Sequence, residues 1–101
     1  MHPVNKRAKP MHEAAELLAI RALSFIAEEP ERLGAFLAVT GWTSAGIREA
    51  ARDPGFLAGV LDHMLADESR LLAFADSAGI DPAGVARARS ALGGGFERDL
   101  P

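Results

Sequence analysis

His63 and the carboxylates near it have the spacing best suited to chemistry in this chain. His63 and Asp67 are four positions apart, which puts two metal-ligating side chains on one face of a helix. Asp62 falls on a different side of that helix, whereas a zinc site needs three or four ligands. The chain contains no cysteine, so a thiolate ligand is excluded. We therefore expect no metal site, and we place His63 at the boundary between core and solvent.

The serine and glycine residues do not form a catalytic or phosphate-binding motif. No serine has a neighbouring histidine–acid pair or lies in a nucleophile elbow, and the glycines are spread through predicted helices and caps. Residues 11–92 also contain no Lys, Asn, Gln, Tyr or Cys. This composition removes a Schiff-base lysine, a phenolic acid and the amide groups that read adenine. We therefore expect a protein that is not an enzyme and that binds no cofactor.

The charge of the chain is unevenly distributed. Residues 11–92 hold seven Arg against 12 Asp and Glu, whereas the first ten residues carry Lys6, Arg7 and Lys9. An acidic body disfavours a broad phosphate-binding surface, so nucleic acid is a disfavoured partner.

The basic start is not followed by an apolar run, and no apolar stretch approaches 18 residues. We therefore expect no signal peptide, no membrane span and a cytoplasmic location.

A 19-residue stretch occurs twice, and it predicts much of the architecture. Arg32–Ala50 is followed 38 residues later by Arg70–Ala88, and eight of the 19 aligned pairs are identical. Self-similarity at a fixed period indicates a repeated structural unit. The identical pairs are Arg32/Arg70, Leu33/Leu71, Ala35/Ala73, Phe36/Phe74, Gly41/Gly79, Ala45/Ala83, Gly46/Gly84 and Ala50/Ala88.

Apolar periodicity and capping residues predict an all-α fold, a compact bundle of about six short helices. Gly41 and Gly79 are expected as left-handed caps, and Gly46, Gly59 and Gly84 as sites of close helix crossing. The three-helix units, about residues 11–52 and 53–93, predict an internal pseudo-two-fold repeat in one domain, with disordered tails at 1–10 and 94–101. The expected helices cover about residues 11–28, 30–40, 44–52, 54–66, 68–78 and 82–93.

Each unit contains a helix–Gly–helix corner that is typical of a helix-turn-helix motif. Trp42 lies in the first corner, where it either fills the core or forms a partner-facing anchor. We expect an interaction surface that combines the two corners, and DNA is the alternative ligand of these helices. The candidate residues of this surface are Trp42, Arg48, Arg52, Arg87 and Arg89.

Two stretches of the chain resemble a known family. They are ALSFIAEEPERLGAFLAVTG at residues 22–41 and DPGFLAGVLDHMLADESRLLAFA at residues 53–75. Both are similar to the pattern of the small alphaproteobacterial family called domain of unknown function 3572. The chain departs from that pattern at His63 and Met64, where an apolar or aromatic residue followed by Leu is expected. The resemblance spans Glu16 to Gly93, and it implies no activity because the family has no established one.

These observations together predict a small helical protein that works by binding other macromolecules. The leading hypothesis is a protein-interaction or adaptor module of the bacterial cytoplasm, present as a monomer or weak dimer. The alternative is a nucleic-acid-binding protein that uses the helix-turn-helix-like units.

Overall fold

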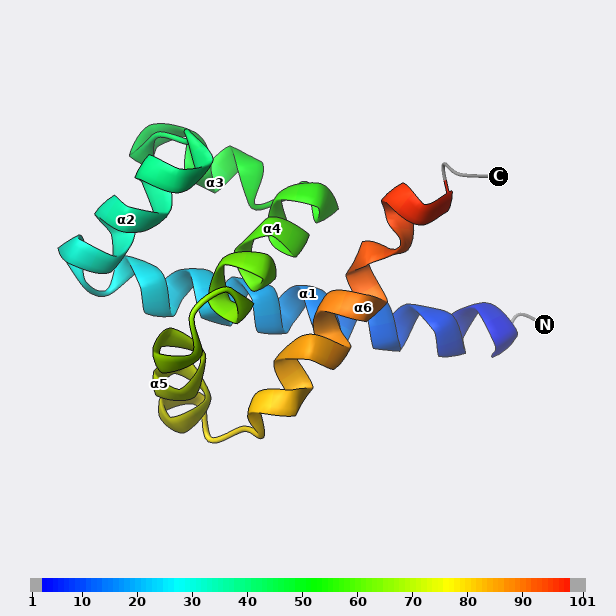
Figure 1. Cartoon of the computed structure of the whole chain (residues 1–101). Helices are drawn as coiled ribbons and strands as arrows, with labels where there is room; N and C mark the ends of the chain where they lie inside the picture. The colour runs from blue at the N-terminus through cyan, green and yellow to red at the C-terminus, as the bar shows by residue number, and fades with distance from the viewer. Residues whose placement is uncertain (1–2, 99–101) are drawn as a thin grey trace.

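The first helix, α1, runs across the whole molecule, and the other helices are arranged around it (Figure 1). The computed structural model describes residues 3–98, and within this range all regular secondary structure is α-helical. The all-α fold class and the six predicted helices are confirmed. The helices are α1 (Pro3–Ala27), α2 (Pro30–Thr40), α3 (Ser44–Ala50), α4 (Pro54–Leu65), α5 (Glu68–Ala78) and α6 (Pro82–Arg98).

The capping residues read from the sequence form the helix ends. The side chains of Thr43, Asp53 and Asp67 accept hydrogen bonds from backbone N–H groups in the first turns of α3, α4 and α5. Such bonds satisfy donors that have no partner inside the helix. Gly41 and Gly79 end α2 and α5 in the left-handed conformation, with φ of 82° and 70°. The predicted glycine caps are therefore confirmed.

Three helix bounds differ from the predicted ones by two residues or more. α1 begins at Pro3, and α6 continues through Gly93 to Arg98, so both pass the predicted domain limits of 11 and 93. Glycine lowers helix propensity by about 1 kcal/mol but permits helical backbone angles, so the glycine run does not force an end. α3 ends at Ala50, two residues before the expected Arg52. Residues 1–2 and 99–101 of the predicted tails lie outside the described residues.

The core lies where α1, α4 and α6 cross, because these three helices pack most extensively on one another. Its side chains come from one face of each helix, and the side chains with no exposed surface include Ala22 and Ile26 of α1, Val60 and Leu61 of α4, and Val85 of α6. α2 packs on α1, and α5 packs mainly on α4. α3 makes no comparably broad contact with another helix of residues 3–98.

Arg32 and Arg70, which are equivalent positions of the repeated stretch, each form a hydrogen bond from one helix to the preceding helix. The Arg32 guanidinium donates to the backbone oxygen of Phe25 near the end of α1 and lies 3.8 Å from the centre of the Phe25 ring. Arg70 donates two bonds, of 3.1 and 2.7 Å, to the backbone oxygen of His63 near the end of α4. Each arginine thereby donates to a carbonyl in the last turn of the preceding helix, where intrahelical partners run out. Each also pairs with the acidic residue three positions earlier, Glu29 at 3.5 Å and Asp67 at 3.6 Å.

The glycines inside helices are not sites of close helix crossing. A methyl group added at Gly59 would meet no atom within 4 Å, and one at Gly84 would meet only the Arg87 side chain at 3.7 Å. At Gly46 the neighbouring atoms belong to Thr43 and Trp42, at 3.2 and 3.5 Å, rather than to another helix. The expectation of close crossing is therefore wrong, because these glycines face space or local side chains.

We expect Gly79→Val to lower the free energy of unfolding by more than about 1 kcal/mol, because a β-branched residue resists positive φ. Gly79 has a φ of 70° and no atom within 4 Å of an added Cβ, so the cost arises from the backbone alone. Urea denaturation measures this difference. Unchanged stability would contradict the left-handed cap.

Gly34→Ala tests a glycine inside a helix, and here we expect the free energy of unfolding to rise rather than fall. Gly34 lies inside α2, and an added Cβ meets nothing within 4 Å. Alanine restricts the unfolded chain and favours helix, so we expect a gain of up to about 1 kcal/mol in the same denaturation experiment. A loss of stability would contradict the open space that the structure shows around an added Cβ at Gly34.

Candidate functional site

Trp42 lies at the corner between α2 and α3, partly exposed and held in place by an aromatic neighbour. Solvent can reach 41% of the surface of Trp42. Its ring meets the Phe56 ring edge to face, with centroids 5.3 Å apart. Phe56 in turn contacts the fully buried Phe36 of α2, with centroids 5.9 Å apart. Trp42 therefore does not fill the core, and its position fits the partner-facing alternative.

An exposed apolar stripe of α2 leads to Trp42. Val39 is 74% exposed, and Ala35 and Ala38 are also on the surface. Ala35, Ala38 and Val39 follow the helical periodicity of three and four residues, so they lie along one side of α2. Trp42 follows just after the helix has ended at its glycine cap. Arg48 of α3 and Arg52 in the turn after it are also exposed, and neither has an ion pair among the described residues. We call these six residues, Ala35, Ala38, Val39, Trp42, Arg48 and Arg52, the α2–α3 corner.

The five residues predicted for one surface are divided between two places. Trp42, Arg48 and Arg52 lie at the α2–α3 corner, whereas Arg87 and Arg89 lie on α6. Figure 1 shows α3 and the connection from α5 to α6 on opposite sides of α4. The two corners are therefore on different sides of α4 in this view, and their action as one surface stays a prediction.

Arg89, one of the candidate surface residues, already has a partner within the protein. Its guanidinium forms an ion pair with Asp62 of α4 at 2.6 Å, and its side chain is 21% exposed. The contact follows from the broad packing of α6 on α4, which brings Arg89 beside Asp62. Arg87 is exposed, as expected.

His63 is buried rather than placed at the boundary of α4. Its residue surface is 9% exposed, and its ring meets Phe36 edge to face with centroids 5.1 Å apart. Burial lowers the pKa of His63, and the nearby Arg70 charge lowers it further, against the opposing effect of Asp67. The described residues contain no group of three or more His, Cys, Asp or Glu side chains able to hold a metal ion.

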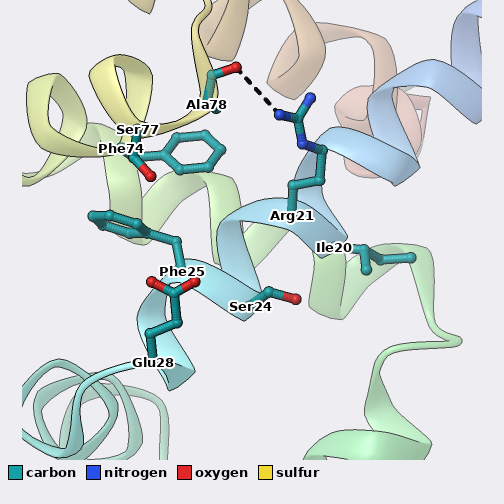
Figure 2. Close-up of a pocket in the computed structure, with 8 residues that line it drawn as sticks. All are labelled: Ile20, Arg21, Ser24, Phe25, Glu28, Phe74, Ser77 and Ala78. Atoms are coloured by element: carbon teal, nitrogen blue, oxygen red, sulfur yellow. Dashed lines mark hydrogen bonds between the residues drawn. The ribbon is translucent and has the colours of Figure 1, made fainter.

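A shallow groove of about 260 Å³ lies between α1 and α5 (Figure 2). Phe25 and Phe74 form an apolar part of its lining, with ring centroids 5.5 Å apart. Arg21 spans one end by donating to the backbone oxygen of Ala78 at 3.2 Å. Ser24, Glu28 and Ser77 line the rest, and no histidine is among the lining residues. The groove offers an apolar contact and hydroxyl groups, but no histidine that would activate either serine.

Sequence reasoning missed two features. The first is the exposure of Val39, which the sequence could have indicated. On the predicted helix, Val39 lies to one side of the apolar face that contains Phe36 and Leu37. The groove between α1 and α5 had no such signal, because it depends on how two distant helices dock.

The fold and these surfaces define a small all-α protein of six helices with an exposed aromatic corner. No helix of residues 3–98 combines the length and apolar character needed to cross a lipid bilayer. The chain belongs to the family described as "Protein of unknown function (DUF3572)", whose match covers residues 12–95. This confirms the resemblance found in the sequence. No curated protein and no solved structure matches the chain.

We expect the free energy of unfolding to fall as the pH drops below about 6.5, the ordinary pKa of histidine. The folded-state pKa of His63 is lowered, so in this range the unfolded chain binds the proton more readily and acid favours unfolding. Above the ordinary pKa this contribution to stability is fully present. Urea denaturation between pH 5 and 8 measures the effect.

His63→Phe is the control for this pH dependence, because Phe25 is the repeat-matched residue and carries no titrating group. The variant should have a flatter dependence of stability on pH in the same range. Parallel profiles for the two proteins would show that His63 binds protons equally well in the folded and unfolded states.

Proposed function

We propose that the protein is a protein-interaction module whose docking surface is the α2–α3 corner. The observation that carries this proposal is the position of Trp42, which is partly exposed and fixed against Phe56. Tryptophan is enriched among residues that dominate binding energy, and a side chain already held in place loses less conformational entropy on binding. Val39 extends the apolar surface beside it.

We further propose that the two three-helix units form an approximate two-fold repeat with helix-turn-helix-like corners. Support comes from α2 (Pro30–Thr40) and α5 (Glu68–Ala78), whose bounds are both displaced by 38 residues. Arg32 and Arg70 make the same contacts in each unit. A strict symmetry is opposed by α3 and α6, which contain seven and 17 residues, and only α6 packs broadly on both α1 and α4.

Nucleic-acid binding has less support as the function of these corners. Arg89, one of the four candidate arginines, is already paired with Asp62. The residues 11–92 carry a net negative charge, which repels phosphate.

The test is affinity capture from the lysate of the source cell, with and without nuclease, using the wild type and Trp42→Ala/Arg48→Glu. We expect a captured protein that resists nuclease and that is lost with the double variant. The loss of the Trp42 contact should weaken binding by at least tenfold if it acts as a hot spot, about 1.4 kcal/mol or more.

The matched control is Leu72→Ala/Arg87→Glu, which makes the same types of change on α5 and α6. Leu72 is 47% exposed, and Arg87 is exposed, so both substitutions are on the surface. This control should retain the captured protein. Capture that is unchanged by the Trp42 variant would refute the proposed surface, and capture that disappears with nuclease would support nucleic-acid binding instead.

A further inference from the structure

Among the side chains that the structure describes, His63 is the one ionisable group that is buried. Its ring packs edge to face against Phe36 of α2, with centroids 5.1 Å apart. Neither ring nitrogen has a hydrogen-bond or ion-pair partner among the described residues, so both depend on the 9% of the residue that solvent reaches. A protonated imidazole has two N–H donors and a charge, and it therefore needs more water than this site admits.

The charged groups that act on His63 come from the start of α5. The Arg70 guanidinium donates to the backbone oxygen of His63 at 3.1 and 2.7 Å, so it places a positive charge beside the ring. Asp67 acts in the opposite direction but less strongly, and its carboxylate is already paired with Arg70 at 3.6 Å. On α4 itself, Asp62 is paired with α6. The side of His63 that faces α5 therefore opposes a second positive charge, whereas the side that faces α2 presents the uncharged ring of Phe36.

Residues 30–52, which we call the α2–α3 segment, are separated from the rest of the fold by a helix break at each end. Glu29 before α2 and Asp53 before α4 both have extended backbone angles. The segment can therefore move without unwinding α1 or α4. α2 packs on α1, whereas α3 makes no comparably broad contact with another helix of residues 3–98. The aromatic rings through which the segment meets α4 are those of Phe36 and Trp42.

We propose that the α2–α3 segment moves away from α4 when His63 is protonated, and that this movement frees Trp42 from Phe56. This inference rests on the proposed function and adds a regulation of the same surface by pH. Arg70 opposes the charged ring on the α5 side, so Phe36 is the neighbour that gives way to water. Phe36 also contacts Phe56, the ring that holds Trp42 in place, so its displacement removes the support of the docking surface.

The experiment follows acrylamide quenching of tryptophan emission from pH 8 to 5, a range above the ordinary pKa of Asp and Glu side chains. Trp42 is the only tryptophan of the chain, so its emission reports on the α2–α3 corner alone. The pKa of His63 is lowered in the docked state, so the ratio of released to docked chains should rise by up to about tenfold per pH unit below 6.5. We expect quenching to increase while the helical circular dichroism signal persists. Quenching that does not change, or that changes only together with loss of the helical signal, would overturn the proposal.

Three variants assign the response to its residues. His63→Phe should abolish it, and Arg70→Gln should move its midpoint to higher pH, because the charge that opposes protonation is removed. His12→Ala is the matched control, since His12 lies on α1 and pairs with Glu16 at 3.5 Å, and the response should remain. A response that survives in His63→Phe, that is lost in His12→Ala or that moves to lower pH in Arg70→Gln would overturn the proposal.

A second measurement does not depend on the folding of any variant. The imidazole proton resonances of His63 in the wild type give the titration midpoint of this residue by nuclear magnetic resonance. This midpoint should coincide with the midpoint of the emission response. Midpoints that differ would show that another group controls the movement.

The regulation and the proposed function fail in different ways, because the quenching experiment uses the protein without a partner. Lysate capture that depends on Trp42, together with quenching that is independent of pH, would refute the regulation and leave the interaction module intact. Capture that is independent of Trp42 would refute the module, and with it the regulation of a docking surface.

Discussion

Burial of the apolar face of α1 is the constraint on which the other contacts depend. Ala19, Ala22 and Ile26 have no exposed surface, and α1 packs on α2, α4, α5 and α6. The alanines add little volume, so α4 and α6 pack on α1 over short side chains. α1 thereby contacts helices from both the first and the second half of the chain.

The repeated sequence places similar connections at the ends of both units, but the environments differ. Arg32 and Arg70 each donate to a carbonyl near the end of the preceding helix. The aromatic ring beside Arg32 is Phe25, whereas the equivalent residue near Arg70 is His63, a titratable ring against Phe36. The same kind of arginine contact therefore lies beside a ring without a titrating group in one place and beside an imidazole in the other.

An aromatic row connects the core to the exposed corner. It passes from His63 to Phe36, then to Phe56 and Trp42, with each ring meeting the next edge to face. Such pairs favour a defined geometry in addition to burying area. Trp42 therefore takes its orientation from residues on α2 and α4, and the candidate docking surface depends directly on the core beneath it.

The sequence by itself determined the helical class and the positions of the glycine and proline residues that bound the helices, and it contains the repeated stretch. These features depend on neighbours within a few residues, as with Pro30, Thr43 and Gly79, or on a period that can be counted. The tertiary structure alone decided that Trp42 is partly exposed, that His63 is buried and that Arg89 pairs with Asp62. Periodicity shows which side of a helix is apolar, but contacts between distant residues depend on how α1, α4 and α6 pack together.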